Sequence, residues 1–320
     1  MEPNTENTIA NTPLGNRQQL LYRIYGVGIL LAIIGLASLL PAPNNLKSER
    51  TPGNASSTGY WTYDQTVAAV LPDAGFQSKI KLGDSITQLV TDGVIDKGKF
   101  VALYKNSGGL PKELKDVLDA SSNKPILLTK ENASIYVNLL WPIGLSNHMV
   151  SNEKSPINGK DLDHFASTGG WNVGKEENGG AYFNKFSIVP LTPQQEALVM
   201  QIAENSYRPC CDNSTFFQDC NHGSALLGLL ELGASQGLNA DDLYREALAF
   251  NSFWFPQNYV ELGLYFKAVK HIDWKYIDPK LALSKDYSSA TGNYKIQAEV
   301  AKIPNLVPPR PTNGGAKCGA

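Results

Sequence analysis

A run of seventeen uncharged residues near the start of the chain constrains its architecture more than any other feature. It extends from Ile24 to Leu40, is rich in Ile, Leu, Gly and Ala, and ends at Pro41. A membrane-spanning helix needs about 20 apolar residues, with a lower limit of about 17, and a proline stops a helix. The sequence therefore predicts a transmembrane anchor over residues 24–41.

The basic residues around this run indicate its orientation. Arg17 and Arg23 precede it closely, whereas Lys47 and Arg50 follow at a greater distance. Positive charge accumulates on the cytoplasmic side of a membrane helix, so residues 1–23 are predicted to be a cytoplasmic tail. The bulk of a single-pass cell-membrane protein would then be extracytoplasmic. A cleaved signal peptide is the alternative, but its basic region would be about 23 residues long, and no small-residue cleavage site is clear.

The remaining chain divides by composition into three parts. Residues 42–59 are polar and contain prolines and glycines, which predicts a linker. Residues 60–303 are long enough for a sizeable core, either as one globular domain or as the two sub-domains 60–145 and 146–303. Residues 304–320 are rich in Pro and Gly and predict a flexible tail. The tail carries Cys318, which could reach the other cysteines, cross-link to another chain or remain free.

The charge distribution argues against nucleic acid as a partner. The chain has 28 basic and 30 acidic residues, so its net charge is −2. These residues are scattered singly, and no basic patch or glycine-rich phosphate loop is evident. The membrane is the partner that the sequence predicts, and no protein partner is indicated.

The fold class predicted for residues 60–303 is mainly α. Residues 192–207 give the strongest helix signal, because Thr192 is a natural cap and Pro193 would occupy the first helical position. Short strands at 126–128 and 185–189 remain open. The other predicted helices cover residues 63–71, 85–94, 97–105, 111–118, 129–140, 224–236, 241–251 and 256–269.

A long irregular segment with many glycines interrupts the helices at residues 146–185. A segment of this length within a compact domain is usually a functional loop or a misread set of strands. Two histidines and two aspartates in it could supply a ligand or a base to a site elsewhere: His148, Asp161, Asp163 and His164.

The chemical information is concentrated in a window where three of the four cysteines lie close together in sequence. Cys210, Cys211 and Cys220 are followed by His222. Thiolate and imidazole are the ligands that zinc and copper prefer. The sequence therefore predicts a zinc or copper site formed by these four residues. Adjacent cysteines are less usual ligands than a pair spaced by two residues.

Cys220 precedes a helix that is apolar on nearly every face, residues 224–236, which is typical of a buried helix. Asp219 or Asn221 is predicted to cap this helix or, for Asp219, to support the metal ligands from behind. The positive end of the helix dipole favours a thiolate at Cys220. The charge of Asp219 would oppose this effect unless its carboxylate is turned away or neutralised.

Three other interpretations of the cluster remain open. Cys220 could form a structural disulfide with Cys210 or Cys211. The cysteines could also be ordinary buried side chains. Finally, Cys220 could be a nucleophile, since Asp219, Cys220 and the following helix resemble the way papain-like peptidases and transpeptidases present their cysteine. The resemblance implies a histidine on a downstream strand, but the only later histidine is His271, in a short polar segment.

The sequence thus predicts a membrane-anchored, extracytoplasmic, helix-rich protein that binds, transports or senses zinc or copper. The alternatives are a cysteine-dependent enzyme, catalysing thiol–disulfide exchange or acyl transfer with Cys220 and His222 in its site, and a disulfide-stapled interaction module.

Overall fold

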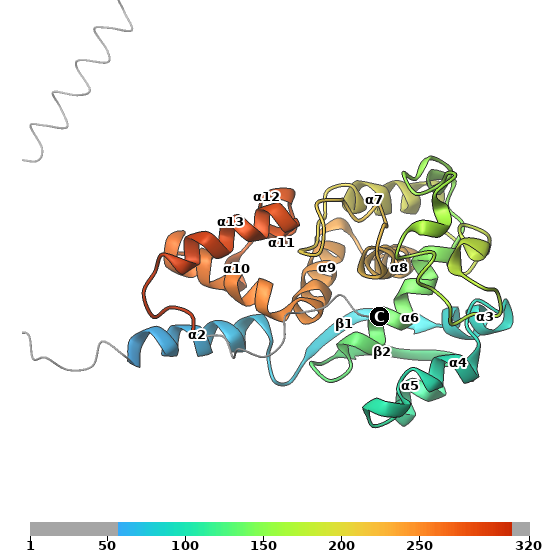
Figure 1. Ribbon diagram of the computed structural model, residues 1–320, viewed down its shortest axis with the longest axis horizontal. Helices are drawn as coiled ribbons and strands as arrows, with labels where there is room; N and C mark the ends of the chain where they lie inside the picture. The colour runs from blue at the N-terminus through green and yellow to red at the C-terminus, as the bar shows by residue number, and fades with distance from the viewer. Residues whose placement is uncertain (1–56, 309–320) are drawn as a thin grey trace, which may run out of the picture. The chain divides into compact units, whose positions relative to one another are not determined.

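The computed structural model describes residues 57–308, and this part of the chain is mainly helical, with 54% helix and 7% strand (Figure 1). The predicted mainly α fold is therefore confirmed. The predicted cytoplasmic tail, the anchor at 24–41, most of the linker and Cys318 lie outside the described residues. Within residues 57–308, no helix combines the length and the apolar character needed to cross a membrane.

The centre of the fold is α8 (Asn221–Ser235), whose residues from Gly223 to Ala234 are all buried. Its main partner is α6 (Ala133–Ser146), and α7 (Pro193–Ala203) and α9 (Ala240–Trp254) also pack on it. The contact with α6 is close because both helices carry glycine there: a Cβ on Gly144 would lie 2.1 Å from the carbonyl oxygen of Ser224. The apolar pattern predicted a buried helix, and the structure confirms it.

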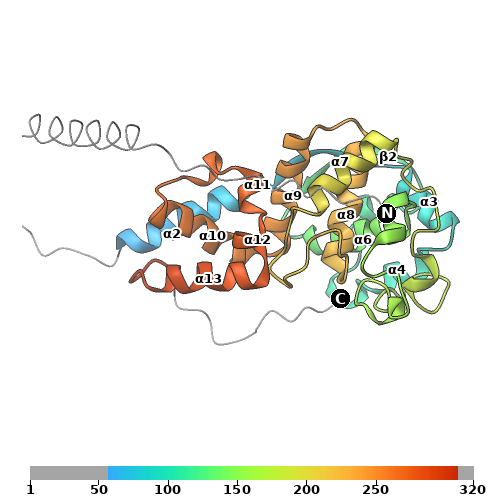
Figure 2. The same ribbon diagram turned by 90° about the horizontal axis from the view of Figure 1, so that it is seen from above.

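A second group of helices surrounds α10 (Pro256–Val269), which packs against α2 (Ser57–Val70) and α13 (Ala290–Ala301), as Figure 2 shows. The bounds of α10 are those predicted from its sequence. The short helices α11 (Pro279–Ala282) and α12 (Lys285–Ser288) lead into α13, and none of these last three helices was predicted. Each begins after a polar cap, at Asp278, Ser284 and Ser289, rather than with a long apolar repeat.

A two-stranded antiparallel sheet is the main departure from the predicted elements. It pairs β1 (Phe76–Gly83) with β2 (Ser122–Leu128), with Phe76 opposite Leu128 and Gly83 opposite Ser122. Alternate residues of β1 are buried, namely Ser78, Ile80 and Leu82, a period of two that indicates a strand. The short strand that the sequence left open at 126–128 is the C-terminal end of β2. Near 185–189, the structure has only an isolated bridge between Asn147 and Phe186.

The remaining helices of the N-terminal half are short: α3 (Ser85–Thr91), α4 (Lys97–Ala102) and α5 (Lys112–Asp116). Each corresponds to a predicted helix that ends earlier than expected. The helix predicted over 129–140 instead begins at Ala133 and continues to Ser146, with Pro142 inside it. Its N-cap is Asn132.

Helix α7 begins as predicted. The Thr192 hydroxyl accepts from the backbone N–H of Gln195, the Gln195 side chain returns a bond to the backbone of Thr192, and Pro193 is the first helical residue. The irregular segment 146–185 contains three 3₁₀ turns: η2 (Val150–Lys154), η3 (Leu162–His164) and η4 (Gly179–Tyr182). Trp171 anchors it, because its ring is fully buried and its Nε1–H donates to the Val94 carbonyl at 2.8 Å.

Glu231 is a buried carboxyl in the middle of α8, and neither of its oxygens has a close hydrogen-bond donor. Burial raises the pKa of Glu231 well above its usual range; the Asn147 amide partly offsets this effect, and the charge of Glu196 adds to it. At pH values between the pKa of Glu231 in the unfolded chain and its higher pKa in the native state, Glu231 is protonated only in the native state. Stability therefore falls as pH rises through this interval.

Glu231→Gln should stabilise the protein at neutral pH by about 1–3 kcal/mol, because it removes an ionisable group that is buried without a cation. Urea unfolding at several pH values measures this. The gain should be small at pH 4 and grow as pH rises. The exposed Glu153→Gln is the control and should change little at any pH. A gain that is the same at all pH values would show that Glu231 keeps its usual pKa.

Candidate metal centre

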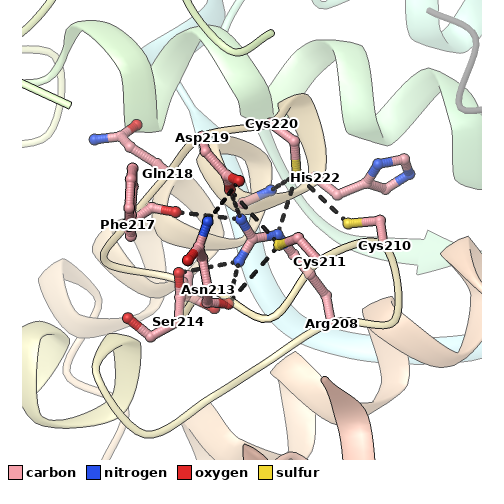
Figure 3. A network of polar contacts seen from close by, with 12 residues as sticks. Arg208, Cys210, Cys211, Asn213, Ser214, Phe217, Gln218, Asp219, Cys220 and His222 are labelled. Carbon is pink, nitrogen blue, oxygen red and sulfur yellow. Dashed lines mark hydrogen bonds and ion pairs between the residues drawn. The ribbon is translucent and has the colours of Figure 1, made fainter. Parts of the chain in front are cut away.

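The structure brings the sulfurs of Cys210, Cys211 and Cys220 together at the start of α8 (Figure 3). All three lie within 4.8 Å of one another, and Cys210 Sγ is 3.5 Å from Cys220 Sγ. The three side chains are half-buried, and none is in a disulfide. Within residues 57–308, they are the one group of three or more His, Cys, Asp or Glu side chains suited to a metal ion.

The cluster is organised by Arg208, whose side chain is fully buried. A guanidinium has five N–H donors, and here each has one bond. Nε donates to Cys220 Sγ at 3.1 Å, and Nη2 donates to the Asp219 carboxylate. The other three bonds go to backbone carbonyls of the loop that joins the cysteines: those of Asn213 at 3.2 Å, Ser214 at 3.0 Å and Phe217 at 3.2 Å.

Gly223 makes room for this guanidinium. A Cβ at position 223 would lie 2.5 Å from Arg208 Nη2 and 2.7 Å from its Cζ, so any larger residue would displace the charge. Arg208 thus packs against the first turn of α8, where the helix dipole is also positive. A buried cation in this place requires anions beside it, and the Asp219 carboxylate and the Cys220 sulfur occupy those positions.

Asp219 supports the cluster but does not cap the helix. Its carboxylate contacts Arg208, accepts from Asn213 Nδ2 at 2.8 Å, and lies 3.6 Å from Cys211 Sγ. The N-cap is Cys220 itself, whose sulfur accepts from the backbone N–H of Gly223 at 3.4 Å. The expectation that Asp219 or Asn221 caps α8 is therefore wrong. The ion pair with Arg208 neutralises the charge that would otherwise oppose a thiolate at Cys220.

The three thiols differ in how readily they ionise. The pKa of Cys220 lies well below its usual range. Hydrogen bonds from the Cys210 and Cys211 thiols lower it, as does the nearby charge of Arg208, although burial opposes these effects. The bonds that Cys210 makes to Cys211 and Cys220, together with burial, raise the pKa of Cys210. The pKa of Cys211 is about 11: a bond from Cys210 lowers it, but its own bond to Cys220 and burial outweigh that effect. Cys220 is therefore the cluster thiol whose surroundings most favour the thiolate.

His222 lies beside the cluster without joining its three sulfurs. Its Nδ1 is 2.8 Å from Asn221 Oδ1, and its ring packs on Phe255 and Trp254, with centroid distances of 4.6 and 5.9 Å. In Figure 3 the imidazole projects away from the centre of the three sulfurs. Burial lowers the pKa of His222 to about 4, so the ring is neutral, which is the form that binds metals. Its role as a fourth ligand stays a prediction.

The polar side chains of segment 146–185 lie elsewhere. His148 Nδ1 is 3.2 Å from the Asn184 carbonyl, and His164 faces Asp161 at 3.8 Å. The segment contributes backbone instead, because the N–H of Ser167 donates to the Asp219 carbonyl at 3.3 Å. The Phe165 and Phe217 rings pack against each other nearby.

Arg208 is the site residue that the sequence analysis did not identify. Arginine side chains usually lie on the surface, and the burial of this one depends on Gly223 and on carbonyls of residues 213–217. The sequence did contain one signal: Arg208 is a single basic residue close to several cysteines and aspartates, which can carry negative charge.

Comparison with known proteins adds no assignment: the chain matches no family model, no curated protein and no solved structure.

Proposed function

We propose that this protein binds one zinc or copper(I) ion through Cys210, Cys211 and Cys220, and that it acts in metal binding, trafficking or sensing. The observation that supports this most directly is the convergence of three sulfurs within 4.8 Å on a loop outside the helices and at the cap of α8. Thiolates are the ligands that select these ions. We also propose that residues 24–41 anchor the protein in the membrane and keep the site outside the cytoplasm.

The spacing of the sulfurs fits such an ion. Zinc lies about 2.3 Å from each sulfur, so tetrahedral ligands are roughly 3.8 Å apart. The 3.5 Å between Cys210 Sγ and Cys220 Sγ is close to this value. Three protein ligands leave one position open for water, for an incoming ligand or for His222. His222 could take it only after its side chain rotates away from Asn221.

The internal hydrogen bonds support an exchangeable ion rather than a structural one. Structural zinc sites hold together loops that are unfolded without the metal. Here the five bonds of Arg208 hold the loop between the cysteines. Four of these bonds, to three backbone carbonyls and the Asp219 carboxylate, involve no cysteine side chain, so most of the network closes without a metal ligand. Transport or sensing, in which the ion enters and leaves, fits this arrangement better than a purely structural role.

Metal analysis of the full-length protein tests the proposal. Protein purified under anaerobic conditions with a phosphine reductant, loaded with Zn²⁺ or Cu⁺ and then desalted, should keep one equivalent of metal. Thiol counting should find the three cluster cysteines protected when metal is bound and reactive after chelation. A protein that keeps no metal although all its thiols are reduced would contradict the proposal.

The second candidate is cysteine chemistry, and the state of Cys220 favours it. Its sulfur caps α8 and accepts from Arg208 and Gly223, an environment that stabilises a thiolate nucleophile. The resemblance to papain-like peptidases also implies a histidine beside the sulfur, but the Cys220 sulfur instead contacts Arg208 Nε, Cys210 Sγ and the Gly223 N–H. A metal-free protein with one thiol that reacts much faster with iodoacetamide than the others would favour this candidate.

A further inference from the structure

The sulfurs of Cys210 and Cys220, which come from separate segments, lie 3.5 Å apart. We propose that these two cysteines form a reversible disulfide and that this oxidation releases the metal, so that the site is controlled by thiol redox state. The release rests on the proposed function. The disulfide does not, because it follows from the arrangement of the thiols in the metal-free protein.

The geometry favours this pair among the three cysteines. Cys210 and Cys211 are adjacent, and Cα atoms joined by a trans peptide are about 3.8 Å apart, below the roughly 4.4–6.8 Å that disulfides require. The Cys211 sulfur also contacts the Asp219 carboxylate at 3.6 Å and the Asn213 carbonyl at 3.9 Å, contacts that it would give up on forming a disulfide. Cys210 and Cys220, by contrast, belong to separate segments ten residues apart.

The surroundings also favour Cys220 as the attacking sulfur. Arg208 Nε and the Gly223 N–H both point at its Sγ, at 3.1 and 3.4 Å. Such donors favour the thiolate, which is the nucleophile in thiol–disulfide exchange. The Cys210 sulfur has no such cation bonded to it in the described structure, and it lies where a resolving thiol must lie.

The oxidant is a low-molecular-weight disulfide of the type of oxidised glutathione. The Cys220 thiolate attacks one of its sulfurs, a mixed disulfide forms, and one small thiolate leaves. The Cys210 thiol then attacks Cys220 Sγ, the Cys210–Cys220 bond forms, and the second small thiol leaves with the proton of Cys210. Two electrons pass from the protein to the oxidant, and one disulfide replaces another.

The consequence for the metal is direct. A sulfur in a disulfide carries no charge and is a poor ligand, so oxidation removes two of the three sulfurs at once. Cys211 alone is left as a thiolate ligand, and a single cysteine does not retain zinc or copper(I) against water and competing thiols. Extracytoplasmic exposure, as proposed for this domain, would bring the pair into contact with oxidants.

The experiment uses the full-length protein with Cys318→Ser, which removes the thiol outside the described residues. The metal-free and zinc-loaded forms are titrated anaerobically with oxidised glutathione. Peptide mapping identifies the disulfide, and a chromophoric chelator detects released zinc. Cys211→Ser keeps the proposed pair and should still form the disulfide, whereas Cys210→Ser should stop at the mixed disulfide on Cys220. Dithiothreitol should restore the thiols and zinc binding.

One Cys210–Cys220 disulfide per chain, with zinc released in proportion, is the expected result. A disulfide between other cysteines, or retention of zinc after the pair has formed, would overturn the inference while leaving the metal site intact. Formation of this disulfide in a protein that never binds zinc or copper would preserve the redox pair and refute the proposed function. The two proposals can therefore fail separately.

Discussion

Replacing Cys220 with serine should weaken metal binding more than any other single substitution in the cluster. The Cys220 sulfur accepts from Arg208 and lies 3.5 Å from Cys210 Sγ, and its surroundings hold its pKa below the usual range. A serine hydroxyl is a hard, neutral donor that soft ions do not select. Zinc affinity, measured by competition with a chromophoric chelator, should fall by more than about 100-fold, beyond the 10–100-fold typical of a lost supporting residue.

The matched variants make this result specific. Cys318→Ser removes a cysteine outside the predicted ligand set and should leave zinc affinity unchanged. His222→Ala tests whether His222 is the fourth ligand that the sequence predicts. An unchanged zinc affinity would assign the fourth coordination position to another ligand. A loss comparable to that of Cys220→Ser would assign it to His222. Circular dichroism and the urea midpoint of each metal-free variant establish that it is folded. Retention of zinc by folded Cys220→Ser would refute the cysteine centre.

The part of the site that could be predicted from sequence is local. The proximity of Cys210, Cys211 and Cys220 follows from their short separation, and the position of Cys220 at a helix start follows from the apolar run after it. Local patterns also determined α7 and α10, where Thr192 and Pro256 mark the first turns. In these cases, the residues that decide the structure are neighbours in the chain.

The features that were missed depend on contacts between distant segments. The strand β1 is stabilised by contacts with α9 and β2 as well as by its alternation of buried and exposed residues. Glu246 of α9 accepts from the Ser78 hydroxyl and from the backbone N–H of Lys79, both at 2.7 Å. The helix capped by Ser289 begins where the Ala290 N–H donates to the Cys211 carbonyl at 2.9 Å. Neither contact is visible in a window of ten residues.

Arg208→Met should be the most destabilising substitution in the cysteine loop. Methionine fills part of the same volume but donates no hydrogen bonds, so three backbone carbonyls, the Asp219 carboxylate and the Cys220 thiolate lose their partner together. Removing one member of a buried ion pair costs about 3–5 kcal/mol, because the remaining charge stays buried without compensation. Urea unfolding of the reduced, metal-free protein should show a loss of this size.

The control is Arg245→Met, which removes an exposed arginine paired with Asp242 on the surface of α9 and should cost less than about 1 kcal/mol. Gly223→Ala provides a second approach to the same network, since the added methyl group displaces the guanidinium while every polar group remains. If Arg208 holds the loop in place of a metal, both Arg208→Met and Gly223→Ala must destabilise the metal-free protein. If instead the metal-free protein is indifferent to Arg208→Met and only the zinc-loaded form loses stability, the loop is ordered by the ion. The site would then be structural, and the case for an exchangeable metal would fail.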